Sequence, residues 1–376
     1  MRVLHFYKTY YPDSFGGAET AINDIARSTA RYGVESEVLS LSRTPAESTM
    51  RVDGHWARKA RLHLEVASTG LSLSVLGEFA RMATGFDIIH YHFPWPMMDV
   101  AHFLAGIRSA TVVTYHSDIV RQKRLLALYK PLMYRFLDSI DHIVATSPNY
   151  LQSSAVLQRF REKVSVIPLC VRPVSRAPTL AAAADAWRRR LGGRFFLFLG
   201  ALRYYKGLPY LIDAAARTGY PVAIAGDGEM ASYLEREVRR RRLANVHLLG
   251  AQTEDEKHAL LEACHAFVFP SHLRSEAFGI ALLEAAEFGR PLISCEIGTG
   301  TSYVNVDGET GRVVPPADPE ALAAAMTELW HDEELAANMG IRARQRYHAH
   351  FTVEVAGEAY ASLYRRLLRS RTSNGA

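Results

Sequence analysis

Two acidic residues, Glu276 and Glu284, stand eight positions apart in the stretch SHLRSEAFGIALLEAAEFGRPLI. At about 100° per residue, that offset would leave their side chains about 80° apart on one helix, so they would not share a narrow stripe. The stretch instead predicts a helix that begins near Phe278 or Gly279, with Glu276 in the preceding loop and Glu284 in the second turn. A helix N-terminus carries free N–H groups and partial positive charge, which suit a phosphate. The two carboxylates would then contact different parts of one ligand; the alternative is that Glu276 balances the helix dipole and Glu284 is solvated.

Two basic residues follow a predicted strand in FLGALRYYKGL. We expect this strand to end at Gly200, and Arg203 and Lys206 to lie in the turn before a helix that begins at Gly207. Turns of this kind lie at the carboxyl edge of a parallel sheet, where ligands bind. Arginine can bind two oxygens with its planar group, and lysine supplies a compact charge. The turn therefore predicts an anion site, and exposed basic residues without a ligand are the alternative.

The first half of the chain contributes glycines and a histidine. Gly16 and Gly17, in FGGAET, stand between the first predicted strand and its helix, where missing side chains let backbone N–H groups approach a ligand. His116 ends the predicted strand ATVVTYH; its alternative is a histidine satisfied within the core. Together these features suit a nucleotide sugar. No Asp-x-Asp pair on a loop, HExxH motif or Cys/His cluster occurs, so we expect no metal and no cofactor, with a diphosphate balanced by Arg203, Lys206 and helix dipoles.

The elements that must position these residues repeat a strand–helix rhythm. Runs such as RVLHFY, DIIHYH and ATVVTYH alternate with helical segments in the first half, and FFLFLGAL, PVAIAG and AFVFPS do so in the second. Such alternation indicates parallel, doubly wound sheets, so we predict an α/β protein with two Rossmann-like domains. A chain of 376 residues is longer than one core usually supports.

The rhythm also predicts the limits of the domains. The first would cover residues 1–172 and the second residues 173–351, with a linker in the proline- and alanine-rich stretch between Leu169 and Gly193. The last helix, within residues 352–376, follows a complete sheet and is expected to return to the first domain.

Charge and cysteine usage narrow the class of protein. The net charge of +5 lies entirely in residues 1–172, which predicts an anionic partner or surface for that half or, alternatively, scattered solvated arginines. The three cysteines are far apart in apolar surroundings and are expected to be buried free thiols. No apolar run reaches the length of a membrane span and no leader pattern precedes the first strand, so we expect a cytoplasmic protein.

These motifs together resemble those of the retaining glycosyltransferases of family 4, which have the GT-B fold: two doubly wound Rossmann-like domains facing across a cleft. The two glutamates with seven residues between them form the family's E-x7-E signature, and GG before Glu19, TYHSD, VIPLCV, KG and DGETGRVVPP are further matches that span almost the whole chain. The chain departs from many relatives at Ala201, where they have arginine. Whether Arg203, two positions later, replaces that arginine is left open.

The resemblance implies roles for particular residues. Glu284 would bind the ribose hydroxyls, Glu276 would lie near the donor sugar and its leaving phosphate, and the backbone at Phe278 and Gly279 would cap the diphosphate. His116 would orient donor sugar and phosphate. His116, Glu276 and Lys206 are therefore the expected catalytic residues, and the expected nucleotide-sugar contacts are Gly16, Gly17, Arg203, Lys206, Gln252, Phe278, Gly279 and Glu284.

The forms GALRYYKG and EIGTGTSYVN most resemble bacterial O-antigen mannosyltransferases. This resemblance implies that the first domain binds a lipid-linked saccharide acceptor and the second binds the nucleotide-sugar donor, GDP-mannose first and GDP-D-rhamnose second. Guanine would be recognised around Ala251 and Gln252. A UDP-sugar transferase, a nucleotide-sugar epimerase and a catalytically silent binding protein are the alternatives. No nucleic-acid partner is expected.

A basic amphipathic segment, RQKRLLALYKPLMYRFL, suggests how the first domain could meet a membrane. It places Arg121, Lys123, Arg124, Lys130 and Arg135 among four apolar residues, the composition of segments that lie on anionic lipid. The apolar residues are Leu125, Leu128, Leu132 and Phe136. The segment predicts peripheral attachment to the inner face of the cytoplasmic membrane. A core helix with a basic solvent face is the alternative.

Overall fold

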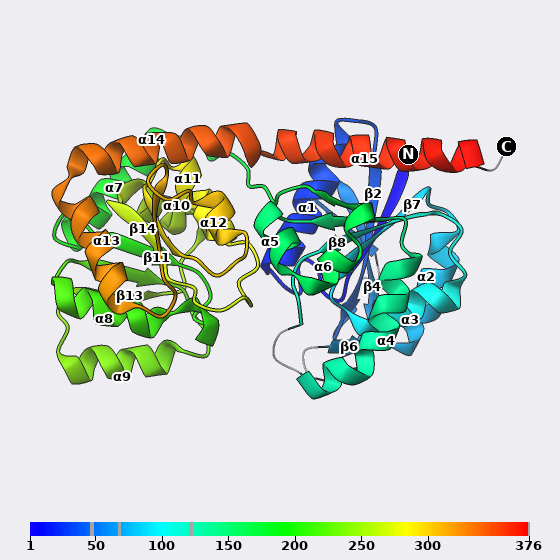
Figure 1. The fold of residues 1–376 in the computed structure, drawn as a ribbon, viewed down its shortest axis with the longest axis horizontal. Coiled ribbons are helices and arrows are strands. Elements are labelled where there is room, and N and C mark those ends of the chain that lie inside the picture. Colours follow the sequence, from blue (N-terminus) through cyan, green and yellow to red (C-terminus); the bar gives the residue numbers. More distant parts are fainter. Residues whose placement is uncertain (46–48, 67–68, 120–122, 375–376) are drawn as a thin grey trace. The chain divides into compact units, whose positions relative to one another are not determined.

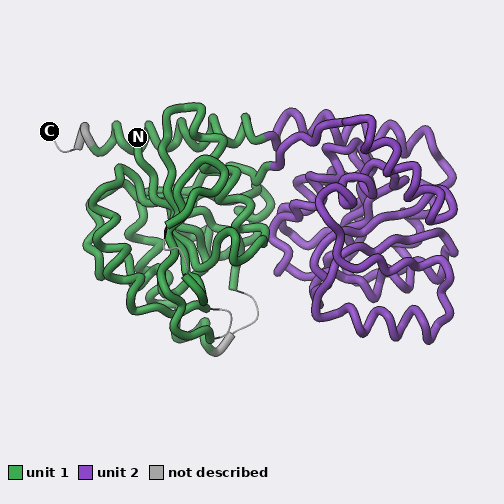
Figure 2. The backbone as a smooth tube through the Cα atoms, turned by 180° about the vertical axis from the view of Figure 1, so that it is seen from behind, with its two compact units in different colours: residues 1–170, 353–376 green, residues 171–352 purple. Residues whose placement is uncertain are grey.

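The computed structural model describes residues 1–45, 49–66, 69–119 and 123–374. The chain divides into two compact units, which we describe separately: unit 1 contains residues 1–170 and 353–376, and unit 2 contains residues 171–352 (Figure 2). Each unit is built on a doubly wound sheet with helices on both faces (Figure 1). The α/β class predicted from the sequence is therefore confirmed.

Unit 1 has an eight-stranded sheet in the order β10-β9-β8-β7-β1-β2-β4-β3. Its strands are β1 (Arg2–Phe6), β2 (Glu35–Ser42), β3 (Thr49–Val52), β4 (His55–Arg61), β7 (Ile88–Phe93), β8 (Ala110–Tyr115), β9 (His142–Ala145) and β10 (Val164–Val166). All neighbours are parallel except β3, which pairs antiparallel with β4. A separate hairpin consists of β5 (Leu64–Val66) and β6 (Thr69–Leu71). The antiparallel edge and the hairpin were not predicted.

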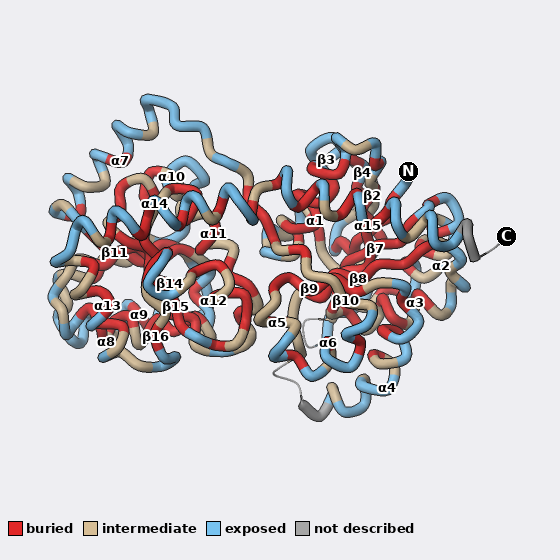
Figure 3. Tube along the Cα trace, turned by 45° about the horizontal axis from the view of Figure 1, so that its top comes forward, coloured by how far each residue is buried: buried red, intermediate tan, exposed pale blue. Residues whose placement is uncertain are grey.

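The helices of unit 1 cover both faces of this sheet. They are α1 (Gly17–Ala30), α2 (Leu73–Ala83), α3 (Pro96–Ala105), α4 (Lys123–Ser139), α5 (Pro148–Ser153), α6 (Ala155–Arg159), the short η1 (Arg161–Lys163) and α15 (Val353–Asn374). The central strands β7 and β8 are buried along their whole lengths, as strands covered on both faces must be (Figure 3).

Unit 2 has a six-stranded sheet in the order β13-β12-β11-β14-β15-β16, parallel throughout. Its strands are β11 (Phe196–Leu199), β12 (Val222–Ala225), β13 (Val246–Gly250), β14 (Ala266–Phe269), β15 (Leu292–Cys295) and β16 (Gly311–Val314). Its helices are α7 (Pro178–Arg190), η2 (Tyr204–Lys206), α8 (Leu208–Thr218), α9 (Ala231–Arg241), α10 (Glu254–Ala263), α11 (Ile280–Glu287), α12 (Thr301–Val304), α13 (Pro319–His331) and α14 (Glu333–His350).

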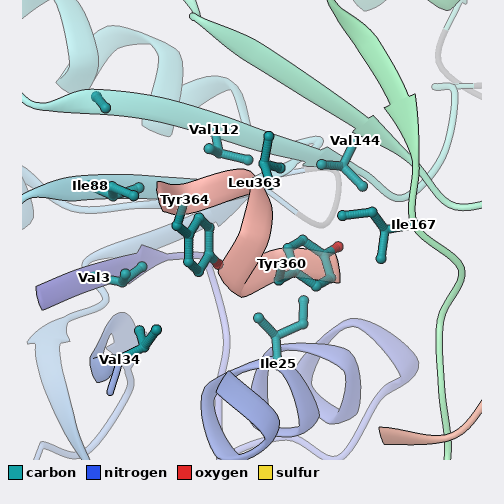
Figure 4. Close-up of a cluster of buried hydrophobic side chains, with 11 residues drawn as sticks. Val3, Ile25, Val34, Ile88, Val112, Val144, Ile167, Tyr360, Leu363 and Tyr364 are labelled. Carbon is teal, nitrogen blue, oxygen red and sulfur yellow. The ribbon is translucent and has the colours of Figure 1, made fainter. Parts of the chain in front are cut away.

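The last helix, α15, supplies part of the core of unit 1. Its residues Tyr360, Leu363 and Tyr364 are buried against the strands and α1, together with Val3, Ile25, Val34, Ile88, Ala110, Val112, Val144 and Ile167 (Figure 4). Unit 1 is therefore completed by a segment from the far end of the chain. All three cysteines are buried and free.

Within the described ranges, no helix combines the length and apolar composition needed to cross a bilayer.

A glycine sets the distance between α15 and α1. A Cβ atom added at Gly357 would lie 2.7 Å from Ser28 Cβ and 2.9 Å from the Ser28 carbonyl carbon, both closer than packed carbons allow. We expect Gly357→Ala to lower the free energy of unfolding by about 1–3 kcal/mol through overpacking. Gly77→Ala in α2 is the matched control, because nothing lies within 4 Å of its added Cβ. That change should stabilise the protein by about 0.5–1 kcal/mol. Denaturant titration measures both, and equal effects would show that α15 does not press on α1.

Candidate functional site

The loops at the carboxyl edge of the unit 2 sheet are held together by glycines. A Cβ at Gly207 would lie 1.9 Å from the Pro270 carbonyl oxygen, and a Cβ at Gly226 would lie 2.0 Å from the Gly200 carbonyl oxygen. Both glycines also have positive φ, 69° and 142°, which side chains disfavour. The turns that follow β11, β12 and β14 therefore touch through their backbones. This contact brings residues from three parts of the sequence to one edge.

Lys206 and Glu276 form a buried ion pair at this edge. The Lys206 Nζ donates to Glu276 Oε2, and each side chain is 11% exposed. The Ser271 hydroxyl donates to the same oxygen over 3.1 Å, and the Lys206 ammonium lies 4.5 Å from the centre of the Phe269 ring. Among the described residues, Glu276 Oε1 makes no hydrogen bond. Burial, reinforced by the charge of Glu276, raises the pKa of Tyr205 to about 12.

Glu284 belongs to a different ion pair. Lys257, on α10, donates to Glu284 Oε1 over 2.8 Å and contacts Glu254 at 2.7 Å. Burial lowers the pKa of Lys257, but the two carboxylates outweigh that effect and the pKa is raised. The side chain of Glu284 remains 25% exposed. Glu284 is thus oriented by a neighbouring helix and still accessible to a ligand.

The helix that carries Glu284 begins as the sequence predicts. α11 starts at Ile280, and Gly279 precedes it with φ 92°. Phe278 is buried and packs on Gly300, where a Cβ would lie 2.5 Å from its ring. The backbone at Phe278 and Gly279 is therefore fixed at the helix N-terminus, where N–H groups and partial positive charge can meet an anion.

Arg203 and Gln252 differ in how far the fold constrains them. Arg203 is exposed, and its guanidinium makes no hydrogen bond or ion pair to any described residue. The Gln252 amide Nε2 donates to the carbonyls of Leu249, over 2.8 Å, and Ala251, over 3.1 Å. Because carbonyls only accept, these contacts define which amide atom is nitrogen. Gln252 Oε1 is buried and has no hydrogen-bond partner in the described part of the chain.

A capping box holds Gln252 in place. The next residue, Thr253, caps α10: its hydroxyl accepts from the Glu256 N–H over 3.3 Å, and Glu256 Oε2 accepts from the Thr253 N–H over 2.9 Å. This reciprocal pair fixes the start of the helix. The backbone around Gln252 is therefore set before any ligand binds.

In unit 1, Gly16, Gly17 and His116 lie at the carboxyl edge of the sheet. Gly16 is the N-cap of α1, and a Cβ there would lie 2.6 Å from Glu19 Oε2. Glu19 is itself buried and accepts a 2.7 Å hydrogen bond from the Thr9 hydroxyl. His116 follows β8 directly and donates its backbone N–H to the Phe93 carbonyl oxygen.

His116 stands at the edge of a cluster of buried histidines. Its Nε2 lies 3.0 Å from His92 Nδ1, and burial lowers the pKa of His116 to about 4. Burial also lowers the pKa of His92 and His90 far below the ordinary value, and that of His5 to about 3, with a smaller effect of His55. These imidazoles are uncharged at neutral pH.

Sequence reasoning thus placed Lys206 and Glu276 separately and did not foresee that they pair. It also missed Ser271 and Lys257, which orient the two glutamates. Ser271 could have been found, because it lies just after the strand that leads to Glu276. Lys257 has no local signal, since it reaches Glu284 from another helix.

Two family models match the chain. The model described as Glycosyl transferases group 1 matches residues 183–346, and the model described as Glycosyltransferase Family 4 matches residues 15–174.

Two relatives match over nearly their whole lengths. D-rhamnosyltransferase WbpZ of Pseudomonas aeruginosa is 50% identical over 352 residues, covering 94% of this chain and 92% of the relative. O-antigen chain mannosyltransferase C of Escherichia coli is 47% identical over 372 residues, covering 99% of this chain and 100% of the relative.

Solved structures show the same fold. Sucrose-phosphate synthase from Thermosynechococcus elongatus superposes with a TM-score of 0.81 at 19% identity, covering 98% of this chain and 99% of that one. Anabaena HepE in complex with UDP-glucose superposes with a TM-score of 0.77 at 19% identity, covering 97% of this chain and 100% of that one.

The Lys206–Glu276 pair yields a stability prediction. Lys206→Met should lower the free energy of unfolding by about 3 kcal/mol, because it leaves a buried carboxylate without its cation. Adding Glu276→Gln to Lys206→Met should recover part of that loss, which corresponds to a coupling of about 1–3 kcal/mol between the two sites. A double-mutant cycle in urea measures it. Strictly additive effects would mean that the two side chains do not interact in solution.

Proposed function

Because the chain belongs to the family 4 glycosyltransferases, in group 1 of the glycosyl transferases, we propose that it is a retaining enzyme that transfers mannose from GDP-mannose. The acceptor is a lipid-linked saccharide in the synthesis of O-antigen or another cell-surface polysaccharide. Unit 2 binds the donor and unit 1 binds the acceptor. The mannosyltransferase at 47% identity over the whole chain supports the sugar and the pathway class.

The observation that carries the proposal is the buried cation at the carboxyl edge of the unit 2 sheet. Lys206 is held beside Glu276, in a turn that also carries the exposed Arg203. Breaking the bond from sugar to phosphate adds negative charge to the diphosphate. A fixed ammonium and the N–H groups at Gly279 stabilise that charge more in the transition state than in the substrate, which lowers the barrier.

Each remaining group has a place in this reaction. Glu284, oriented by Lys257, accepts hydrogen bonds from the ribose hydroxyls. Glu276 lies at the donor sugar, and His116 orients the sugar and the phosphate. In the retaining mechanism, the leaving phosphate takes the proton of the acceptor hydroxyl on the same face of the sugar. The reaction therefore needs no separate general base, and the spacing rules of paired glycosidase carboxylates do not apply.

GDP-D-rhamnose is the second candidate donor. The D-rhamnosyltransferase at 50% identity favours it. Mannose and D-rhamnose differ by one hydroxyl, and a pocket that does not bind that hydroxyl directly discriminates only weakly between them.

The side chain of Gln252 favours guanine as the base of the donor nucleotide. Its Oε1 is a buried acceptor without a partner among the described residues. The Nε2 of the same amide already donates to the Leu249 carbonyl, which fixes the orientation of the side chain. Guanine presents two adjacent donors, the N1–H and the N2 amino group, to an acceptor of this kind. Uracil presents only one, so it leaves more of the polar edge unpaired.

We expect GDP to bind at least about tenfold more tightly than UDP, since one unsatisfied polar group costs about 1–3 kcal/mol. Gln252→Met should reduce that preference to about threefold or less, because GDP binding weakens more than UDP binding. Competitive titration with GDP, UDP and ADP measures both. Tighter binding of UDP by the unaltered protein would assign a different class of donor.

The proposed peripheral attachment to the inner face of the cytoplasmic membrane uses the first half of α4. Leu125 and Leu128 are 53% and 81% exposed, and Lys130 beside them is exposed as well. The neighbouring helix α3 adds Leu104, which is 67% exposed. Phe136, which the sequence pattern placed on the same apolar face, is fully buried and faces the core instead. Arg121 lies outside the described residues.

We expect the protein to float with vesicles containing phosphatidylglycerol, and the bound fraction to rise with anionic lipid and fall with salt. The double change Leu125→Ser with Leu128→Ser should lower that fraction severalfold. Ile341→Ser on α14 is the matched control, because Ile341 is an exposed apolar residue (56%) of unit 2. Binding that ignores both lipid charge and salt, or that the control reduces equally, would contradict the assignment.

A further inference from the structure

Three histidines of unit 1 form one hydrogen-bonded chain that ends at His116. His116 Nε2 lies 3.0 Å from His92 Nδ1, and His92 Nε2 lies 3.1 Å from His5 Nδ1. His5 lies in β1, His92 lies in β7 and His116 directly follows β8, and these three strands are neighbours in the sheet. Their rings are stacked, with centroids 5.3 Å apart in the first pair and 5.4 Å in the second. The chain therefore runs from the carboxyl edge of the sheet into its centre.

The two ends of this hydrogen-bonded chain differ in their access to a ligand. At the inner end, His5 Nε2 is buried and has no hydrogen-bond partner among the described residues. At the outer end, His116 is only partly buried, and no described residue hydrogen-bonds to its Nδ1. The inner end is thus closed to any partner, and the outer end is open to a ligand.

The hydrogen bonds of the chain are coupled in direction. A neutral imidazole carries one N–H and one acceptor nitrogen, so the two links must point the same way. Either all three protons sit on Nδ1, or all three sit on Nε2. The second arrangement buries the His5 Nε2–H without an acceptor. An unpaired buried N–H is rarer in proteins than an acceptor with an unused lone pair, so the first arrangement is favoured.

We propose that His5 and His92 are positioning residues that hold His116 as the neutral tautomer with its proton on Nδ1, so that its open end donates a hydrogen bond to the bound ligand. The acceptor is an oxygen of the sugar or of the phosphate; only this identification rests on the proposed function.

The same coupling opposes protonation of His116. A second proton, on Nε2, would turn that atom into a donor, reverse both links and move the unpaired N–H to His5 Nε2. The described groups around His116 do not stabilise its charged form either. His92 and Tyr7 contact its ring, and both are uncharged. His5 and His90, which lie behind His92, are uncharged as well. Burial lowers the pKa of His116 in the same direction.

His90 belongs to the cluster but not to the chain. Its ring stacks on His92 with centroids 4.5 Å apart, yet its own nitrogens bond to Tyr364 and Thr114, each over 2.7 Å. The ligand atoms of His5, His90 and His92 lie within 4.8 Å of one another. Because both nitrogens of His90 and of His92 are already hydrogen-bonded, the cluster is better described as a hydrogen-bond network than as a metal site.

The test is nitrogen NMR of the full-length protein with ¹⁵N-labelled histidine, with the His116 signals assigned by their loss in His116→Gln. We expect the unaltered protein to show His116 with its proton on Nδ1 and no titration between pH 5 and 8. His92→Phe keeps the ring but removes the link. It should give a mixture of tautomers and raise the pKa of His116 by at least about one pH unit toward the ordinary value of 6.5. His90→Phe, the matched control, should leave the tautomer unchanged.

A proton on Nε2 in the unaltered protein would overturn the proposal, as would an unchanged tautomer and pKa in His92→Phe. Equal changes in His90→Phe would also overturn it, since they would assign the effect to packing. If His92→Phe does not fold, His5→Leu replaces it, because loss of the inner end should also release the tautomer.

A kinetic measurement separates this inference from the proposed function. In His92→Phe, kcat/KM for sugar transfer should gain a pH dependence between pH 5 and 7 that the unaltered enzyme lacks. A released tautomer without any kinetic change would uphold the hydrogen-bonded chain and overturn the contact of His116 with the donor.

Discussion

The backbone contact between Gly207 and Pro270 determines where the charge of unit 2 can lie. With a Cβ only 1.9 Å from a carbonyl oxygen, any other residue at Gly207 would push the turn after β11 away from the loop after β14. That loop carries Glu276, which pairs with the Lys206 ammonium, and Ser271, which donates to the same carboxylate oxygen. An ammonium in this buried position is tolerated only beside its carboxylate, because desolvation without a partner costs several kcal/mol. The ion pair therefore depends on a glycine that has no functional side chain of its own.

The candidate site residues of the two units are buried in different ways. Unit 2 buries charges as pairs, Lys206 with Glu276 and, less deeply, Lys257 with Glu284. A ligand with its own negative charge can compete for such cations, so these pairs suit a site whose contacts change during a reaction. Around His116, unit 1 instead buries uncharged imidazoles that hydrogen-bond to one another. A neutral network resists change, which suits a group that must keep one orientation.

Much of the fold could be read from the sequence because its signals are local. Strand runs, helix periodicity and the glycine before α11 each act over a few residues, and they predicted two doubly wound sheets and the start of that helix. The individual site residues could also be nominated from their motifs. Their partners could not, since Lys257 meets Glu284 across 27 positions and His5 meets His92 across 87. Contacts of this kind can be predicted only when the order of the strands is known, and strand order is a property of the whole sheet. The antiparallel β3 and the β5–β6 hairpin were missed because strands of three or four residues are too short to show a clear hydrophobic period.

The position of α15 has a consequence for synthesis on the ribosome. Tyr360 and Tyr364 fill the core between strands whose residues begin at Val3, so the first strands made must wait for the last helix. The interval between β10 and α15 is about 190 residues, or about 10–40 s at typical rates of translation. Unit 2, residues 171–352, is synthesised during that interval and can begin to fold before α15 is made. The half of the chain that is made first therefore completes its core last, and part of its apolar sheet surface stays uncovered until α15 is made.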